Sequence, residues 1–499
     1  MKNIIRYYLF LNWLFLSLSI FLLINYFIRG AFVGSLLLFD IFGLTTRITF
    51  QINFLTTLLF FMACFLSVSI AQYSVRYLSG EPRQEYFFRY LGLITISVSV
   101  FLLSNNFLII FLAWALISFL LFKLLTFYPN RIGAKESAIK KNIVSRFGDL
   151  FLLSGILIIA GTFETLEIDQ IVNQVDSLVR TGEKKVPLSI SVILFSIGAL
   201  IKSVQVPFHF WLPDTMETPT PVSALMHAGI VNGGGIFILK SSQIIGYSQI
   251  ALALMVVFGT VSAVFGALVM ITQNSIKKKL AYSTISQMGM MMLACGLQLH
   301  AVALFHIFAH SLYKSMAFLS TGSIIDESKK IQCKPMYVSS HVVLSIVFAC
   351  SLILVIGVIF LNWTQFAYTL YFLVLLMGLC TSFFVKGFEG KAIYAFCKGI
   401  GILIIAIVLY FFVESFLHFE LEDLYRVNVE SYSSMIQLFI GLFVFITFGI
   451  GFYLSNEMIS PNKEWSKALY VFFWNGGFLP VKTDYIMRKV FSSKNINQV

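Results

Sequence analysis

Histidine and lysine side chains recur at helical spacing within one apolar segment of the sequence. The segment FHIFAHSLYKSMAFL places His306, His310 and Lys314 four residues apart. On a helix this spacing puts all three side chains on one face. Imidazole and amine groups take up and release protons, so this face could carry a water-linked proton path. Structural hydrogen bonding and a zinc pair are the alternatives. The HExxH glutamate is missing and no third ligand is evident, so we expect no metal site.

A second group of ionisable residues lies beside a cluster of prolines in KSVQVPFHFWLPDTMETPTPVSALMHAG. Lys202 precedes Pro207, the first of these prolines, and His227 follows the last. A helix that reaches Pro207 loses backbone hydrogen bonds there, and broken helices at membrane depth are buried in protein or line wet cavities. We therefore expect a discontinuous helix near Pro207, with Lys202 and His227 as proton carriers. The plainer alternatives are a lysine that snorkels to the interface and a core histidine bonded to a carbonyl.

Three more charged residues lie in apolar segments. Lys240 follows the glycine run 233–235, and it could join the same path or snorkel outward. Arg146 and Asp149 are three residues apart in VSRFGDLFLL, and they could form a structural ion pair or belong to the relay. A charge at the centre of a bilayer costs on the order of 3 kcal/mol or more, so each of these residues is a functional candidate.

The elements that must hold these residues are transmembrane helices. The chain has 499 residues, of which 58% are hydrophobic and 12% are charged. A soluble domain has about a quarter of its residues charged, so this composition excludes a soluble enzyme and leaves a polytopic helical membrane protein. We expect an all-α bundle of about 14 helices, each with about 20 residues. The expected spans are 8–27, 52–72, 88–104, 106–127, 140–161, 188–206, 222–245, 250–272, 277–297, 299–323, 341–361, 366–385, 392–413 and 434–454.

The placement of charges predicts the orientation of these helices. The net charge is +12, and basic residues such as the lysine run 277–279 gather in the loops on the side of the N-terminus. The loop 414–430 on the opposite side is acidic. Basic loops face the cytoplasm, so we expect both termini there, and we expect the basic surplus to set topology rather than to bind nucleic acid. The first helix lacks a small-residue cleavage site, so we expect it to be retained.

Sequence signatures of covalent catalysis are absent. The chain has no P-loop, no GxGxxG that opens a helix after a strand and no nucleophile elbow. Its six cysteines are scattered without a CxxC pair, which argues against a disulfide framework or a thiolate metal site. We therefore expect a chain that moves ions or transmits energy, is not itself an enzyme and has no cofactor of its own.

Three motifs together resemble the antiporter-like subunits of respiratory complex I and Mrp antiporters. They are the proline segment quoted above, KKKLAYSTISQMG and FHIFAHSLYKSMAFLSTGSI, and the resemblance covers about 75–325. It implies two inverted five-helix repeats, each with a broken helix, and it matches Lys202 to the central lysine of the family. It also implies a hydrophilic axis formed by His227, His306, His310 and Lys314.

The sequence departs from that family in two places. The family has WEG in the helix that supplies a glutamate partner to the central lysine, whereas this chain has Trp114 followed by Ala115. The second repeat of the family carries a GFFSKDE-like broken helix, whereas HVVLSIVFACSLILVIGVIFLNW has neither lysine nor proline. We therefore expect Lys202 to lose its charge more readily or to use another partner such as Asp149, and we expect the exit half-channel to be altered or missing.

These departures, with LLTFY at 124–128 and SRFGDL at 145–150, resemble the DabB branch of membrane subunits from inorganic carbon accumulation complexes. The resemblance implies a cytoplasmic partner similar to DabA that carries the zinc. It also implies that proton or sodium ion flow across a bacterial inner membrane is coupled to the hydration of CO2 to bicarbonate. Two alternatives stay open: a proton-pumping subunit of NADH:quinone oxidoreductase or of an Mrp Na+/H+ antiporter, and a non-conducting membrane anchor.

The expected domain organisation follows from the motifs. We expect N-terminal transmembrane helices at 1–87, a first antiporter-like repeat at 88–245 and a diverged second repeat at 250–385. C-terminal helices at 386–463 and an amphipathic cytoplasmic tail at 464–499 complete the chain.

Overall fold

The computed structural model describes most of the chain in five long stretches and several short ones. The described residues are 2–41, 44–181, 186–321, 366–367, 369–371, 373–374, 415–417, 419–421, 434–459 and 463–490. The expected helices at 341–361 and 392–413 lie outside the described residues, and so does most of the expected helix at 366–385. The acidic loop 414–430 also lies largely outside them.

The secondary structure is almost entirely helical. Three short 3₁₀ helices carry the label η. The described elements are α1 (Lys2–Arg29), β1 (Phe32–Ile41), β2 (Leu44–Ile52), α2 (Phe54–Tyr77), α3 (Gln84–Leu103), α4 (Phe107–Leu125), α5 (Ile132–Phe163), α6 (Ile168–Thr181), α7 (Val186–Lys202), η1 (Pro213–Glu217), α8 (Thr220–Ala228), η2 (Ile230–Asn232), α9 (Gly233–Lys240), α10 (Ser242–Ile245), α11 (Gln249–Thr272), α12 (Ile276–Gly296), α13 (His300–Leu319), α18 (Ser434–Ile459), α19 (Glu464–Trp474), η4 (Gly476–Phe478) and α20 (Leu479–Val490).

These helices form a polytopic bundle, as the composition predicts. Within the described residues, nine helical segments are long and apolar enough to cross a membrane, judged by length and composition. Helix α4 shows why: it exposes Leu112, Leu116 and Phe119 on one face and buries Trp114 and Ile117. An exposed apolar face of this length suits lipid rather than water. The expected all-α membrane fold is confirmed, with one hairpin as an addition.

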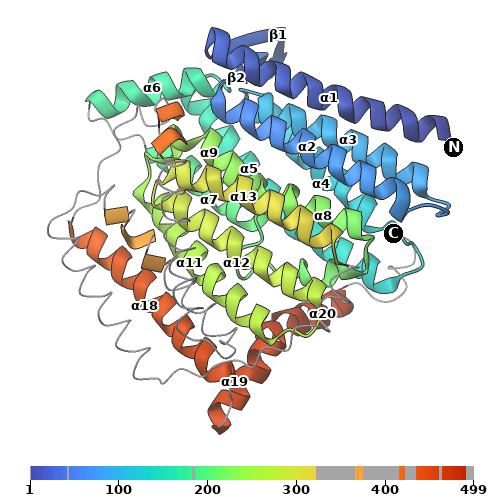
Figure 1. The fold of residues 1–499 in the computed structure, drawn as a ribbon. Coiled ribbons are helices and arrows are strands. Elements are labelled where there is room, and N and C mark those ends of the chain that lie inside the picture. Colours follow the sequence, from blue (N-terminus) through green and yellow to red (C-terminus); the bar gives the residue numbers. More distant parts are fainter. Residues whose placement is uncertain are drawn as a thin grey trace, which may run out of the picture.

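The bundle has two distinct ends (Figure 1). The hairpin β1–β2 and helix α6 lie at one end, which we call the hairpin end. Helices α19 and α20 lie at the other end, which we call the α20 end. On the flank beside α2 and α3 runs α1, while α18 packs against α11. Helix α20 approaches the start of α5, where the side chain of Lys140 contacts that of Asp484.

The hairpin and α6 are structures that the sequence analysis missed. The hairpin pairs its strands antiparallel, and α6 lies in the stretch 162–187 that was expected to be a loop. The turn between α3 and α4 joins them: the amide of Asn105 donates to the carbonyl of Thr49 at 2.9 Å, and the amide of Ile168 donates to the carbonyl of Asn105 at 2.9 Å. These bonds satisfy backbone groups that leave the helices here. They fix β2, the α3–α4 turn and α6 to one another.

Helix α7 ends earlier than the expected span 188–206. It stops at Lys202, and Val204 has a φ of +61°. A β-branched residue rarely adopts this left-handed conformation, so the backbone is strained here. The helix therefore ends in a tight turn before Pro207 instead of being cut by the proline itself. As a result Lys202 lies at the negative end of the helix dipole, which favours an ammonium group.

Two further expected helices are interrupted. The span 222–245 was expected to be continuous, but it consists of α8, η2, α9 and α10, with a break at Gly229 and the following 3₁₀ turn. The amphipathic tail consists of α19 and α20, which are separated by Gly476 and Gly477 with φ values of +60° and +66°. Glycine adopts this conformation without the steric cost that other residues have. Figure 1 shows the resulting angle between α19 and α20.

Candidate functional site

The deepest ionic contact in the described residues joins α7 to α5. The ammonium of Lys202 forms an ion pair with Oδ1 of Asp149, and their side chains are only 2% and 8% exposed. Oδ2 of Asp149 lies 3.0 Å from Nη2 of Arg146, whose side chain is 49% exposed. Buried charges are stable only when they are compensated. Asp149 therefore serves two cations, and one of them is almost inaccessible.

Neighbouring residues shape the space around Lys202. A Cβ atom at Gly148 would lie 2.6 Å from Cγ of Lys202, so only glycine leaves room for the lysine stem. The ammonium of Lys202 lies 4.2 Å from the ring centroid of Trp114, which is close enough for a cation–π interaction. The next residue on α4 is Ala115, where the resemblance leads one to expect a glutamate. The carboxylate that pairs with Lys202 thus comes from α5 and not from α4.

Two lysines at the start of the expected helix 140–161 are buried in α5. Lys140 contacts Oδ2 of Asp214 at 2.5 Å and also forms an ion pair with Asp484 of α20. The ammonium of Lys141 donates to the carbonyl of Ser118 at 2.8 Å. Both lysines are only 4% exposed. A position at the start of an apolar span does not show that other parts of the chain bury these lysines.

A group of histidines lies where α8, α12 and α13 meet. Nδ1 of His227 lies 3.2 Å from the hydroxyl of Thr284, and its ring stacks on Phe318 with the ring centroids 4.4 Å apart. Nε2 of His310 lies 3.2 Å from the carbonyl oxygen of His227. The backbone of α8 therefore connects the two histidines, although their rings do not bond directly.

The polar stripe of α13 lines a cavity of about 830 Å³. His306, His310 and Lys314 all face this cavity, together with Ser283 and Gln287 of α12. The rings of His306 and His310 are nearly parallel with centroids 6.1 Å apart, and the ammonium of Lys314 donates to the hydroxyl of Ser283. A cavity of this size holds many water molecules. In the part of the chain that the structure describes, no group of His, Cys, Asp and Glu side chains is suited to hold a metal ion.

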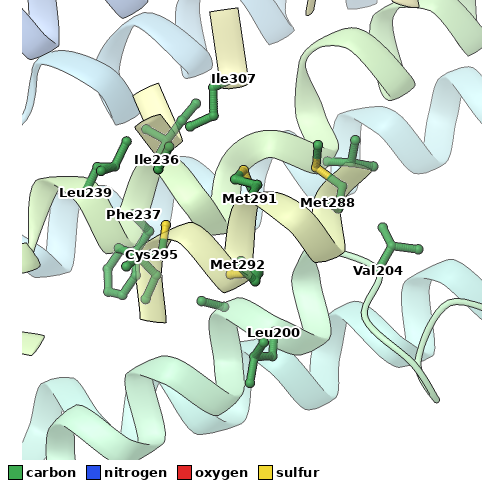
Figure 2. Close-up of a cluster of buried hydrophobic side chains, with 14 of the residues drawn as sticks. Leu200, Val204, Ile236, Phe237, Leu239, Met288, Met291, Met292, Cys295 and Ile307 are labelled. Atoms are coloured by element: carbon green, nitrogen blue, oxygen red, sulfur yellow. The ribbon is translucent and has the colours of Figure 1, made fainter. Parts of the chain in front are cut away.

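Lys202, Asp149 and Arg146 form one polar group, which we call the lysine group. His227, His306, His310 and Lys314 form the histidine group, and the two groups are separate. Within the described ranges no hydrogen bond or ion pair joins Lys202 to His227. Figure 2 shows Met288, Met291 and Met292 of α12 among apolar side chains of α7, α9 and α13. Helix α7 carries Lys202 and α13 carries the histidine stripe. Buried apolar side chains therefore fill the junction between the helices of the two groups.

Lys240 belongs to neither group. Its ammonium lies near the carbonyl oxygens of Phe101, Leu102 and Ser104, at 3.3, 2.5 and 2.6 Å. These carbonyls form the last turn of α3, which is the negative end of that helix. The lysine does not snorkel into solvent, because it is held at the hairpin end by this turn.

Residues 203–212, between α7 and η1, interrupt the helix, and we call them the broken segment. They contain polar groups that the sequence alone did not single out. Among the described residues, the side chains of Ser203, Gln205, His209 and Trp211 have buried polar atoms without a hydrogen-bond partner, and for His209 this holds for both ring nitrogens. Buried polar atoms are nearly always satisfied by protein or by ordered water. These atoms indicate water along the segment that follows Lys202. The signal in the sequence was a histidine placed between the first two prolines of the cluster.

Residues 104–388 match the family model described as "NADH:quinone oxidoreductase/Mrp antiporter, TM". This range is more than half of the chain, and it contains both the lysine group and the histidine group. The chain belongs to this family. Residues 39–88 match a second family model, described as "NADH-Ubiquinone oxidoreductase (complex I), chain 5 N-terminus". The resemblance seen in the three sequence motifs is therefore confirmed, and the chain is a multi-pass membrane protein of the antiporter-like family.

Similar members of the antiporter-like family come from two kinds of complex. The chain is 40% identical over 294 residues to a probable inorganic carbon transporter subunit DabB2 of Halothiobacillus neapolitanus, which covers 58% of this chain and 53% of that protein. It is 39% identical over 277 residues to NADH-ubiquinone oxidoreductase chain 5 of Podospora anserina, covering 55% of this chain and 42% of that protein. The chain thus spans about half the length of the curated relatives it matches.

The fold also resembles a solved structure of an antiporter complex. The Mrp complex from Dietzia sp. contains a chain that superposes with a TM-score of 0.61 at 19% identity, covering 99% of this chain and 61% of that one. At this identity the similarity supports the fold alone. It agrees with the bundle that the apolar helices form here.

Proposed function

We propose that this antiporter-like chain conducts protons across the bacterial cytoplasmic membrane and couples the proton motive force to CO2 hydration and bicarbonate accumulation. The zinc chemistry would belong to a cytoplasmic partner similar to DabA. This chain would be the energy-coupling subunit rather than an enzyme. The similarity to a probable inorganic carbon transporter subunit supports this proposal.

The observation that carries the proposal is the buried pair of Lys202 and Asp149. While both groups are charged they compensate each other. When a proton leaves Lys202, Asp149 keeps its charge with only Arg146 beside it. The protonation state of Lys202 therefore changes the attraction between α7 and α5. The passage of a proton through Lys202 would in this way change the electrostatic attraction between α5 and α7.

Helix α5 offers a route from this pair to a partner. Lys140 lies on the same helix and contacts Asp214, which follows the broken segment, and Asp484, which belongs to α20. The α20 end is rich in basic residues, and the positive-inside rule places such an end in the cytoplasm. A partner docked there would be within reach of any movement that α5 and the broken segment transmit.

The proposed path uses both polar groups. Protons would enter at the hairpin end and pass Lys202 in the first repeat (88–245). They would then cross the apolar junction around Met288, Met291 and Met292 when water enters it, and use His227, His310 and Lys314 before they leave at the α20 end. The cavity along α13 supports water in the second repeat (250–385). The unpartnered polar atoms of the broken segment support water after Lys202.

A second candidate is a proton-pumping subunit of an NADH:quinone oxidoreductase or of an Mrp antiporter. The relative from Podospora anserina favours it through its 39% identity. Against it stands Ala115, because the family's glutamate would give Lys202 a second carboxylate. A non-conducting anchor is the least favoured candidate, since buried charges are costly unless they have a role.

The test is the rescue of a carbonic-anhydrase-deficient host in air by the full chain together with the protein encoded beside it. We expect growth with the native chain, and loss of growth with Lys202→Ala or with an uncoupler. Lys135→Ala is the matched control, because Lys135 lies on α5 but is partly exposed. Rescue that survives both Lys202→Ala and the uncoupler would contradict energy coupling by this chain. A complete set of quinone reductase genes beside it would favour the second candidate.

A further inference from the structure

A second cavity opens at the hairpin end of the bundle, beside Lys240 at the end of α9. Its volume is about 580 Å³, and polar side chains from β2, α6 and α9 line it. Asp169 and Asp176 of α6 and Glu420 contribute carboxylates, Gln51 contributes an amide, Arg180 contributes a guanidinium and Lys240 contributes an ammonium. We call this cavity the Asp169 vestibule. Lys240 is the last residue of the membrane-crossing segment Thr220–Lys240, so the vestibule reaches the membrane helices.

Asp169 is built into the wall of the vestibule as a negative charge. Its Oδ1 accepts a hydrogen bond from Nε2 of Gln51 at 3.1 Å, and its Oδ2 accepts one from Nδ2 of Asn105 at 2.8 Å. Both donors are neutral amides, so they hold the carboxylate without cancelling its charge. Asp176, two turns further along α6, is instead paired with Arg180 at 3.1 Å. Asp169 is thus the carboxylate of α6 whose charge remains available to a cation.

Unsatisfied polar atoms beside Asp169 point to water. Oδ1 of Asn105 and the hydroxyl of Thr49 have no hydrogen-bond partner among the described residues, and these side chains are only 1% and 3% exposed. Buried polar atoms are nearly always satisfied, so ordered water is the expected partner. The other end of the Asn105 amide bonds to Asp169, which places this water next to the carboxylate. Burial raises the pKa of Asp169 above its usual value, although the Asn105 bond and the charge of Lys240 oppose that change.

The charge of Lys240 discriminates between a metal cation and a proton that move from the vestibule toward the membrane helices. Its ammonium is fixed by the carbonyls of the last turn of α3. A fixed positive charge repels a metal cation that has entered the vestibule. A proton can pass in the following way: Lys240 gives one proton to water that has entered between it and Lys202, that water protonates Lys202 after Lys202 has lost its own proton, and Lys240 then takes up another proton from the water of the vestibule. Lys240 is therefore positively charged again after each proton transfer.

Five buried aromatic rings form a cluster beside Lys202. The ring of Trp114 lies 5.3 Å from that of Phe101 and 5.8 Å from that of Phe237. The remaining two rings are those of Phe107 and Phe195, which pack on each other and on Phe237.

Residues of this aromatic cluster contact both lysines, Lys202 through a ring and Lys240 through a backbone carbonyl. The carbonyl of Phe101 lies near the ammonium of Lys240, and the ring of Trp114 carries the ammonium of Lys202. A dry apolar constriction between two wet regions blocks ions until it is hydrated. The cluster is therefore placed to act as a gate between the two lysines.

We propose that the Asp169 vestibule is the entrance of the proton path, that Lys240 is the proton carrier that excludes metal cations, and that the aromatic cluster gates transfer to Lys202. This inference rests on the proposed function, because it supplies the first half of the same path. It also selects the proton over the sodium ion as the translocated species.

The first test measures proton and ²²Na⁺ uptake into liposomes that contain the full chain. Lys240→Arg keeps a cation on the three carbonyls, but a guanidinium does not deprotonate, so we expect proton uptake to fall about tenfold or more. Asp169→Asn removes one of the attracting charges of the vestibule and leaves Glu420 in place, and it should lower uptake about tenfold. Glu164→Gln is the control, since Glu164 is exposed at the same end and does not line the vestibule. Wild-type uptake by Lys240→Arg, or sodium uptake by the native chain, would overturn the inference.

The second test does not depend on conduction. Asn173 lines the vestibule, so Asn173→Cys should react faster with a membrane-impermeant cationic thiol reagent than with an anionic one. The preference should disappear when Asp169→Asn is added, and equal rates in the single variant would contradict a cation-attracting entrance. If Lys202→Ala abolishes uptake while the Asp169 and Lys240 variants conduct normally, the proposed entrance is wrong and the proposed function stands. If Lys202→Ala conducts normally, the proposed function fails.

Discussion

Asp149 and Lys202 form an ion pair between α5 and α7, although 53 positions separate them in the sequence. Gly148 lets α5 and α7 approach closely at this level, because a Cβ atom there would lie 2.6 Å from Cγ of Lys202. The pair replaces the carboxylate that related chains are expected to supply from α4. The stability of the chain therefore depends on this ion pair and on the close packing at Gly148.

Asp149→Asn should destabilise the chain strongly. Removing one partner of a buried ion pair leaves an uncompensated charge, which costs about 3–5 kcal/mol. We expect a lower thermal unfolding temperature of the full chain in detergent. The double variant Asp149→Asn with Lys202→Met removes both charges and should recover most of that stability while remaining inactive. A double variant as unstable as the single one would show that the charge of Lys202 is not the cause.

Gly148→Ala should displace Lys202. The added Cβ atom would lie 2.6 Å from Cγ of Lys202, and overpacking of this kind costs about 1–3 kcal/mol. The control is Gly161→Ala on the same helix, where nothing lies within 4 Å of the added atom. That change should be neutral or stabilising by up to about 1 kcal/mol, because alanine is the better helix former. Thermal unfolding and proton uptake of the two variants, measured side by side, check the prediction.

Asp484→Asn should uncouple the α20 end from the proton path. It breaks the contact of α20 with Lys140, while Asp214 continues to compensate that lysine. The side chain of Asp484 is 38% exposed, so we expect a loss of only about 1 kcal/mol in stability. Rescue of growth should fall while proton uptake into liposomes persists. Glu464→Gln, whose side chain is 92% exposed in a surface pair, should leave both unchanged. Parallel loss of rescue and uptake would argue for a purely structural contact.

Thr284→Val should disturb the histidine group without altering its charge. The change removes the hydroxyl that lies 3.2 Å from Nδ1 of His227 and leaves a buried ring nitrogen unpaired, at a cost of about 1–3 kcal/mol. We expect slower proton uptake and lower thermal stability. Thr447→Val on α18 is the matched control, because that exposed hydroxyl bonds only to the carbonyl of Phe443 in its own helix. Equal uptake by both variants would remove His227 from the path.

The sequence predicts local relationships in this molecule better than distant ones. Spacing places His306, His310 and Lys314 on one face, and all three line one cavity. Spacing also pairs Arg146 with Asp149. The same reasoning offers Asp149 to Lys202 only as one option, because nothing in a local pattern shows which helices become neighbours. That information lies in the packing of α5 against α7.

The misses have local physical causes. The hairpin is largely apolar, but each strand has only nine or ten residues, so a search for helical spans of about 20 residues does not detect it, although the alternation in LTTRITFQI is typical of a strand. The early end of α7 depends on the conformation of Val204, which its side chain disfavours, so no propensity rule would choose it. The burial of Lys140 and Lys141 depends on Asp214, Asp484 and Ser118, which come from other parts of the chain.

Helix α5 has a consequence for how this chain could evolve. Lys140 and Asp149 are nine positions apart on one uninterrupted helix, a rise of about 13 Å, so the helix works as a stiff lever with a charge at each arm. The far arm contacts α20 through Asp484, whereas the near arm holds Lys202, the proposed proton carrier. The surface that would contact a partner is thus separate from the residues proposed to carry the proton. A different partner could bind at the α20 end without changes in the proposed proton path. One ion-conducting frame could in this way serve several kinds of chemistry.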